Sequence, residues 1–221
     1  MSSTRDTRES SSRLRISFLG PLGTYSHQAT TDFFGSSSDF SLLPVERIVD
    51  VFDSVKSGSS DFGIVPIENS SFGSVLETAE QLRSTTLSVR GMVQLKIGHS
   101  LLARRGVARD AEGKKRIKRV YSHEQGLGQC REYLAANYRQ AEVVPVTSTA
   151  KAAQNAAQDS EGLAICSLKC AEVYELDIVD TDIQDAGFSN TTRFICLSKP
   201  ERSLPDLFPI QRPKKNDAAE Q

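Results

Sequence analysis

Short β-branched runs alternate with segments of helical periodicity along most of the chain, and this alternation restricts the fold more than any other feature. It is typical of an α/β protein, in which helices cover the faces of a sheet. Strands are expected at residues 15–19, 40–45, 62–67, 87–102 (one long or two short strands), 119–121, 143–146, 163–166, 177–179 and 194–197. Helices are expected after Thr24, which suits an N-cap, and at 48–56, 75–82, 123–136, 150–157 and 168–174.

Composition excludes several classes of protein. A net charge of −1 over 221 residues gives no general attraction to nucleic acid or to an anionic membrane. No apolar run approaches the roughly 20 residues that a membrane span needs. Residues 1–14 are polar without an apolar centre, so a disordered tail is expected there rather than a secretory signal, and a second disordered tail is expected at 199–221. A cytoplasmic location follows as an expectation.

The four cysteines are expected to be buried thiols, in keeping with a reducing compartment. Cys166 and Cys170 are four residues apart, but no histidine lies near them in the sequence, so no metal site is predicted. The basic run from Arg104 to Arg119 has no aromatic residues suited to base stacking, and an exposed insertion is preferred over a nucleic-acid site.

Small hydroxyl residues recur where expected strands lead into helices. Helix N-termini at such turns present free backbone N–H groups at one edge of a sheet, where anions bind. The residues are Thr24, Ser26, Ser70, Ser71, Ser122, Ser148 and Thr149. This pattern by itself predicts a cleft for a small anion and nothing narrower.

Five separated stretches carry a more specific signal. They are Gly20–His27 (GPLGTYSH), Val65–Ser70 (VPIENS) continuing to Val75, Tyr121–Gln125 (YSHEQ) ending at Gln129 and Cys130, Ser148–Ala153 (STAKAA), and Asn190–Phe194 (NTTRF). Each resembles a motif of the prephenate dehydratase family, and the five follow the family's order between Arg15 and about Ser198. A single three-residue match would mean little, whereas five in order make a strong resemblance.

The resemblance implies a two-lobed α/β fold similar to the type II periplasmic binding proteins, with the active site between the lobes. The first lobe would hold residues 15–98 and 190–198, and the second would hold residues 99–189. The implied activity is the conversion of prephenate to phenylpyruvate with loss of carbon dioxide and water, in phenylalanine biosynthesis. No cofactor is expected, because aromatisation of the ring drives the reaction.

The resemblance also implies roles for individual residues. Catalytic roles fall to Thr192, Glu68, Asn69, Ser122 and Gln129. Thr192 would donate a hydrogen bond to the departing hydroxyl or form one link in a proton relay. Glu68 would be either an acid of raised pKa or a brace for its turn. Arg193 would grip the pyruvyl carboxylate through paired hydrogen bonds. The other substrate-binding residues would be Ser70, Phe194, Thr24, Ser26, Ser148 and Thr149. His27, His99 and His123 are expected to be structural rather than directly catalytic.

Two alternatives stay open. Arogenate, the transaminated form of prephenate, would use the same cleft, and a non-catalytic small-anion binding module would share the fold. Family members commonly carry a phenylalanine-binding ACT domain, for which the 23 residues after Ser198 are too few. The sequence is therefore either a catalytic part or an unregulated form. Family members also commonly self-associate, so a homo-oligomer is a further expectation.

Overall fold

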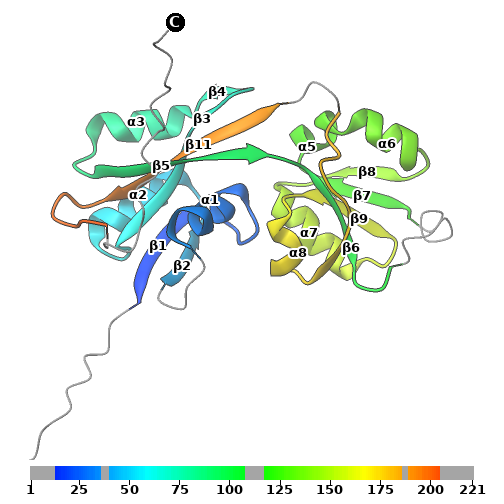
Figure 1. Ribbon diagram of the computed structural model, residues 1–221, viewed down its shortest axis with the longest axis horizontal. Helices are drawn as coiled ribbons and strands as arrows, with labels where there is room; N and C mark the ends of the chain where they lie inside the picture. Colours follow the sequence, from blue (N-terminus) through cyan, green and yellow to red (C-terminus); the bar gives the residue numbers. More distant parts are fainter. Residues whose placement is uncertain (1–12, 36–39, 108–116, 186–188, 205–221) are drawn as a thin grey trace, which may run out of the picture.

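The protein consists of two α/β lobes that lie side by side (Figure 1). It is described here from a computed structural model, which covers residues 13–35, 40–107, 117–185 and 189–204. The predicted two-lobed α/β fold class is confirmed. None of the helices in these ranges has the length and apolar character needed to cross a membrane. The same ranges contain no cluster of three or more His, Cys, Asp or Glu residues suited to a metal ion.

The first lobe is built on a mixed sheet with the strand order β2-β1-β3-β11-β5, and the short β4 pairs with β3. Helix α1 covers one face of this sheet, and α2 and α3 cover the other. The strands are β1 (Leu14–Leu19), β2 (Phe40–Val45), β3 (Phe62–Asn69), β4 (Gly73–Ser74), β5 (Ser88–Ile97) and β11 (Asn190–Ser198). The helices are α1 (Tyr25–Phe34), α2 (Ile48–Ser57) and α3 (Leu76–Ser84).

The second lobe has a five-stranded sheet in the order β10-β6-β9-β7-β8. Its strands are β6 (Ser100–Arg104), β7 (Arg119–Ser122), β8 (Glu142–Pro145), β9 (Gly162–Cys166) and β10 (Leu176–Asp180). Its helices are α5 (Glu124–Gln129), α6 (Arg131–Asn137), α7 (Thr149–Gln158) and α8 (Lys169–Val173).

Each lobe contains the same parallel unit. In the first, β1 lies between β2 and β3 and is parallel to both, and in the second β7 lies in the same way between β8 and β9. Helices connect the parallel strands, as a parallel arrangement requires. Ligands of such sheets bind beyond the carboxyl ends of the strands. The two units turn those ends toward the space between the lobes, so the topology itself predicts where the site lies.

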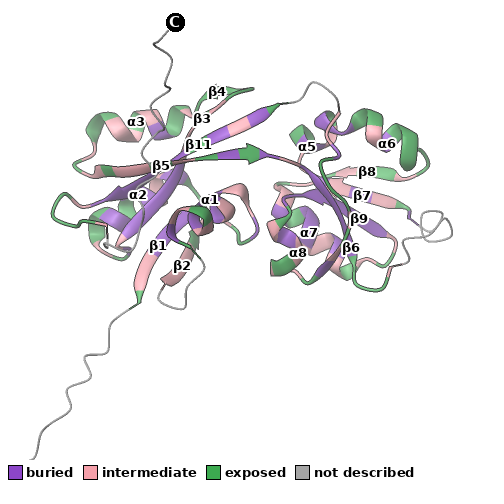
Figure 2. Ribbon diagram, viewed as in Figure 1, coloured by how far each residue is buried: buried purple, intermediate pink, exposed green. Residues whose placement is uncertain are grey.

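The central strands β3, β9 and β11 are buried on both faces over most of their length, which explains their long apolar runs (Figure 2). Successive residues of β11 illustrate the alternation, because Phe194 packs with the apolar side chains under α1 while Ile195 packs with those under α2. The second lobe likewise has two clusters. One includes Leu134 of α6, and the other is rich in alanines of α7 such as Ala153.

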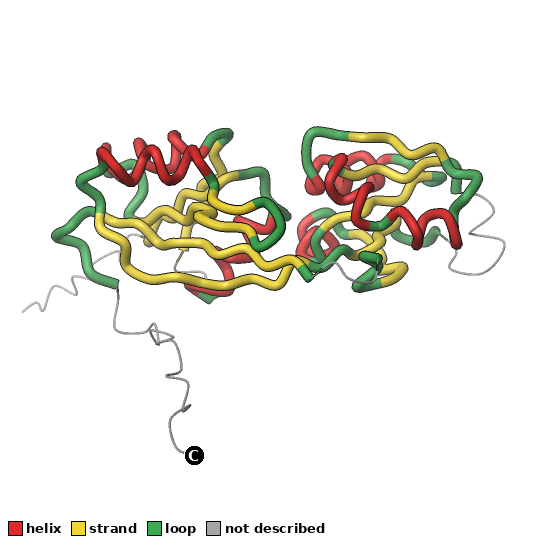
Figure 3. Tube along the Cα trace, turned by 90° about the horizontal axis from the view of Figure 1, so that it is seen from above, coloured by secondary structure: helices red, strands yellow, loops and turns green. Residues whose placement is uncertain are grey.

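The chain passes between the lobes twice, first from β5 to β6 through Gly98 and His99, and again on its return from β10 to β11 (Figure 3). The lobes also touch at a third place. The Ser167 hydroxyl donates to the Gly23 carbonyl at 2.7 Å, and the Tyr174 hydroxyl donates to the Leu22 carbonyl at 2.6 Å. These bonds attach the turn before α1 to the second lobe.

Three sequence expectations need correction. The helix predicted for 123–136 is divided at Cys130, whose backbone (φ −119°, ψ 23°) ends α5 before α6 begins. Gly126 and Gly128 reduce the intrinsic helical stability there. Strand β11 begins at Asn190, four residues before the predicted strand.

The third correction concerns the C-terminal tail, which was predicted to begin at residue 199. Residues 199–204 instead lie on the first lobe. Arg202 pairs with Asp61 at 3.1 Å and lies over the Phe62 ring. The rest of both predicted tails, apart from residues 13 and 14, falls outside the described residues. So do residues 108–116 of the predicted basic insertion.

Candidate active site

A cleft of about 480 Å³ separates the two lobes where the parallel strands end. The first lobe contributes the end of β1, the start of α1, the end of β3 and the start of β11. The second lobe contributes the starts of α5 and α7. Seven of the predicted site residues line this cleft, namely Thr24, Ser26, Asn69, Gln129, Ser148, Thr149 and Thr192. Segments far apart in the sequence are therefore brought to one place.

Asn69 and Thr192 form a fixed pair on the floor of the cleft. The Asn69 carboxamide oxygen accepts from the backbone N–H groups of Ser71 and Phe72 at 2.9 and 3.1 Å, which sets the orientation of the amide. Its Nδ2 consequently faces Thr192 and donates to Oγ1 at 2.8 Å. Because a hydroxyl group has one proton, accepting from Asn69 leaves the Thr192 O–H free to donate into the cleft.

A β-bulge produces this pairing. Along β11, Thr192 is opposite Asn69 and Arg193 is opposite Glu68, but Phe194 is opposite Pro66, so Ile67 is the extra residue of β3. A bulge re-aims the side chains on one side of it relative to simple alternation. As a result Asn69 lies on the same face as Thr192, while Glu68 lies on the other face with Arg193.

Two ten-residue helices begin at the cleft, and both have side-chain N-caps. The Thr24 hydroxyl oxygen accepts from His27 N at 3.3 Å at the start of α1, and the Ser148 oxygen accepts from Lys151 N at 3.0 Å at the start of α7. The first N–H groups of each helix have no partner within the helix, and the helix dipole adds positive potential there. The two helix starts can therefore bind carboxylate oxygens.

Charged side chains are scarce in the cleft. Among the described residues that line it, Glu46 is the only one with a carboxylate, and none is a lysine or an arginine. Burial lowers the pKa of His99, against an opposing effect of its hydrogen bond to Gln129, so this ring is neutral at neutral pH. The described lining therefore offers an anion backbone N–H groups and neutral donors in place of a lysine or arginine.

Gln129 projects from the end of α5 and is buried. Its Oε1 lies 2.6 Å from His99 Nε2, and His99 Nδ1 lies 3.0 Å from the Tyr25 hydroxyl. All three residues line the cleft. Gln129 was predicted at the site, whereas no direct role was predicted for His99 or Tyr25, because nothing in the sequence spacing shows that these segments meet.

Asn190 is a site residue that the sequence analysis did not propose. It lines the cleft and is 6% exposed, and its Oδ1 has no hydrogen-bond partner among the described residues. A buried amide oxygen without a partner is costly, so a donor from a bound ligand would stabilise it. A signal for it was present, because Asn190 lies two residues before Thr192 on one strand and such residues share a face.

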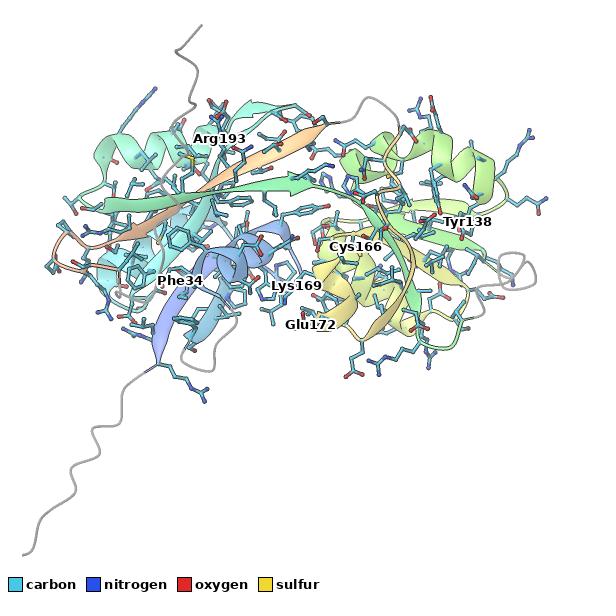
Figure 4. All side chains as sticks on the ribbon, viewed as in Figure 1. Phe34, Tyr138, Cys166, Lys169, Glu172 and Arg193 are labelled. Carbon is cyan, nitrogen blue, oxygen red and sulfur yellow. The ribbon has the colours of Figure 1, made fainter. Side chains whose placement is uncertain are left out.

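Arg193 does not lie in the cleft, which corrects its predicted grip on the substrate carboxylate. It follows Thr192 on β11 and so points to the opposite face of the sheet, where its guanidinium pairs with Glu68 at 2.8 Å. Figure 4 shows it in the first lobe, near α3. Both side chains are about half exposed, and neither is among the residues that line the cleft. Glu68 thus fits the bracing role and not the acidic one.

Three further predicted residues also lie outside the cleft lining. Phe194 is 2% exposed within the core under α1. Ser122 is fully buried and donates to the Ile165 carbonyl at 2.7 Å, which connects the ends of β7 and β9. Ser70 is exposed, and its hydroxyl oxygen accepts from Thr191 N at 2.9 Å. These residues support the strands next to the cleft and are not part of its lining.

The fold and the site define a two-lobed α/β protein with a cleft between its lobes that is lined mostly by neutral polar side chains. The family model described as prephenate dehydratase matches residues 16–202. The chain belongs to the prephenate dehydratase family.

Individual relatives agree with this. The chain is 34% identical over 187 residues to a bifunctional chorismate mutase/prephenate dehydratase of Aquifex aeolicus, covering 85% of this chain and 49% of that protein. It is 34% identical over 190 residues to arogenate dehydratase/prephenate dehydratase 6 of Arabidopsis thaliana, covering 85% of this chain and 44% of that protein. The chain thus spans about half the length of these curated relatives.

A solved structure shows the same fold. The prephenate dehydratase of Arthrobacter aurescens in complex with L-Phe superposes with a TM-score of 0.73 at 30% identity, covering 87% of this chain and 62% of that one. The similarity extends over both lobes and therefore over the cleft between them.

Proposed function

We propose that this chain is a prephenate dehydratase, which converts prephenate to phenylpyruvate, carbon dioxide and water. The observation that carries the proposal is the Thr192 hydroxyl in the cleft lining, whose oxygen accepts from Asn69 and whose own O–H is therefore left to donate to a ligand. In the reaction the bond from the ring to its carboxylate breaks and its electron pair enters the ring. The bond from the ring to the hydroxyl breaks at the other end, and one proton converts the departing hydroxide to water.

Thr192 acts on the leaving hydroxyl. A threonine is too weak an acid to give up its proton outright, so it donates a hydrogen bond that strengthens as negative charge develops on the oxygen. Donors placed where charge develops contribute several kcal/mol to many enzymes, about 3 in a well-studied case. The proton that completes water then comes from solvent.

The two carboxylates of prephenate need opposite treatment. The pyruvyl carboxylate must be held, and the starts of α1 and α7 supply N–H groups for it. The ring carboxylate must lose its charge, and a cation beside it would stabilise the reactant instead. The described cleft lining contains no lysine or arginine, which leaves the ring carboxylate without such stabilisation.

The direct test is formation of phenylpyruvate from prephenate by the purified chain at neutral pH, beside Asn69→Ala. Turnover by the parent is expected, with roughly a 30-fold lower kcat in the variant, because losing the bond that orients Thr192 costs about 2 kcal/mol. A folded parent that binds prephenate without turning it over would refute the enzyme and leave a binding module.

Arogenate is a second candidate substrate, favoured by the unpartnered Oδ1 of Asn190. Arogenate carries an ammonium group where prephenate has a ketone, and an ammonium can donate to that oxygen. The kcat/KM ratio of arogenate to prephenate measures the preference. If Asn190 recognises the ammonium, Asn190→Leu lowers this ratio, whereas an unchanged ratio excludes that role.

A further inference from the structure

We propose that His99, which lies between Tyr25 and Gln129, is a positioning residue that holds the Gln129 amide with its NH2 group directed into the cleft. The kinetic part of the proposal rests on the proposed dehydratase function. The structural part concerns a hydrogen bond that exists with or without turnover.

The three residues come from three parts of the molecule. Tyr25 begins α1 in the first lobe, His99 lies where the chain crosses between the lobes, and Gln129 ends α5 in the second lobe. His99 and Gln129 are 4% and 7% exposed. The chain of contacts therefore runs across the floor of the cleft and joins the lobes through side chains.

The tautomer of His99 decides which end of the amide faces the ligand. A neutral imidazole has one N–H donor and one acceptor nitrogen. Gln129 Oε1 lies 2.6 Å from Nε2, so Nε2 carries the proton and donates it, and the amide NH2 group points the other way. Nδ1 is then an acceptor. The Tyr25 hydroxyl lies 3.0 Å from Nδ1 and 3.0 Å from a second acceptor, the Gly98 carbonyl, so its one proton is shared between the two.

The opposite tautomer would suit an anion poorly. With the proton on Nδ1, Nε2 would need a donor, and the amide would turn its NH2 group toward His99. Gln129 would then present its oxygen to the cleft. A carboxylate of the substrate, itself an acceptor, would face this oxygen and would lose the hydrogen bond that the NH2 group could donate. Since the described lining has no lysine or arginine, a single neutral donor carries unusual weight here.

The return segment between the lobes holds both partners in place. Gln184 Oε1 accepts from His99 N at 2.9 Å, and Ile183 N donates to the His99 carbonyl at 3.0 Å. In the same segment, directly after Gln184, Asp185 N donates to the Gln129 carbonyl at 2.8 Å. One short segment therefore sets the separation between the His99 ring and the Gln129 side chain.

Gly126 allows α5 to come close enough for this contact. A Cβ built at this position would lie 2.6 Å from Ser122 Oγ and 3.8 Å from the His99 ring. A methyl group there would push α5 away from β7. The glycine that weakens the helix locally thus permits the approach that brings Gln129 to His99.

The kinetic test compares His99→Leu, His99→Gln and Gln129→Ala in the full chain with prephenate. His99→Leu removes the donor and is expected to lower kcat/KM by about 10- to 30-fold, the equivalent of one lost hydrogen bond. His99→Gln keeps an N–H donor near the position of Nε2, so it is expected to stay within about 3-fold of the parent.

The double variant separates positioning from a general structural effect. If His99 acts through Gln129, His99→Leu has no further effect on kcat/KM in a Gln129→Ala background. Losses that multiply would show that His99 acts independently, and His99→Gln being as poor as His99→Leu would show that the donor is irrelevant. Either result overturns the proposal. Thermal unfolding of each variant excludes loss of the fold as the cause.

The second readout needs no turnover. Nitrogen-15 NMR of the imidazole rings at pH 7, assigned by the signal lost in His99→Leu, is expected to show His99 neutral with its proton on Nε2. A proton on Nδ1 in the parent, or a charged ring, refutes the proposal. A parent with the Nε2 proton but no prephenate turnover refutes the dehydratase function and leaves the positioning hydrogen bond standing.

Discussion

The two lobes are built from the same parallel unit but contribute different chemistry to the cleft. In each, a central strand lies between two parallel neighbours, and an arginine on that strand pairs with an aspartate just before the third strand. The pairs are Arg15 with Asp61 in the first lobe and Arg119 with Asp159 in the second. Both pairs lie at the amino ends of the strands, away from the cleft, where they support the fold.

The lobes differ at the carboxyl ends of the strands. Each lobe has an antiparallel strand beside the third strand of its unit, β11 beside β3 and β6 beside β9. The pairing of β11 with β3 has a bulge at Ile67, which places Asn69 and Thr192 side by side, whereas β6 and β9 pair in regular register. The second lobe presents the starts of α5 and α7 and the buried amide of Gln129. The two units are therefore alike at the amino ends of their strands and differ at the carboxyl ends, with the Asn69–Thr192 pair on one lobe and the Gln129 amide on the other.

The largest effect is expected from Thr192→Val, which keeps the β-branched shape and removes the donor. The kcat of this variant for prephenate should be at least about 100-fold below that of the parent, or about 2.7 kcal/mol of barrier, because the leaving hydroxyl loses its hydrogen bond. Thr191→Val is the matched control, since Thr191 bonds to Ser70 through its backbone, and it should stay within about 3-fold of the parent. Equal losses in the two variants would contradict the assignment.

A smaller effect, on stability, is expected from the aspartates at the opposite ends of the strands. Asp159→Asn should lower the free energy of unfolding by about 2 kcal/mol at pH 7, because Asp159 accepts two charged hydrogen bonds from Arg119, at 2.7 and 2.9 Å. Asp61→Asn should cost somewhat less, since its side-chain bonds to Arg15 are longer, at 3.3 and 3.4 Å. Denaturant unfolding measures both.

The pH dependence of these losses follows from the pKa shifts. The hydrogen bond from Arg119 lowers the pKa of Asp159, against the opposing effect of burial. Burial raises the pKa of Asp61, but hydrogen bonds from Arg15 outweigh it and lower the pKa overall. A folded pKa below the unfolded value of about 3.9 gives stability that is present above about pH 4 and lost as the pH falls further. The difference in unfolding free energy between the parent and each variant should shrink below about pH 4. A difference that stays constant with pH would exclude the charge of the aspartate as its source.

Sequence reasoning found the strands and helices because their apolar patterns reflect local rules of burial. It also found Thr24 and Ser148, because an N-cap is a local feature of the chain. It failed at Arg193, which shares a motif with Thr192 but faces away from the cleft by simple alternation. It could not find the bulge at Ile67, because a bulge is a relation between two strands that lie about 120 residues apart in the sequence. The contact between His99 and Gln129 was hidden for the same reason.

A still smaller effect is expected at the start of α7, in the second lobe. Ser148→Ala removes the N-cap of α7, which should cost about 1 kcal/mol of stability. Loosening the first turn should also weaken anion binding and raise KM by roughly 3- to 5-fold, an effect below 1 kcal/mol. The kcat should change little, because the reacting hydroxyl belongs to the other lobe. A loss mainly in kcat would break the proposed division of roles between the lobes.

The smallest effect is expected from Arg193→Met. Arg193 belongs to the same motif as Thr192 but lies outside the cleft lining, so this variant tests whether the motif alone predicts a role in activity. Met keeps the length of the side chain and removes its charge. Because an exposed ion pair contributes at most about 1 kcal/mol, the unfolding free energy should change by less than that amount. The kcat and KM for prephenate should both stay within about 2-fold, less than about 0.4 kcal/mol. A rise in KM of about 30-fold or more would mean that the guanidinium reaches the substrate carboxylate after all, which would require β11 to rotate or another chain to complete the site.

Glu68→Gln distinguishes an Arg193 that only braces the strands from an Arg193 that binds the substrate carboxylate. If the pair only braces the two strands, it should match Arg193→Met in both activity and stability, whereas a carboxylate-binding Arg193 released from its partner would lower KM.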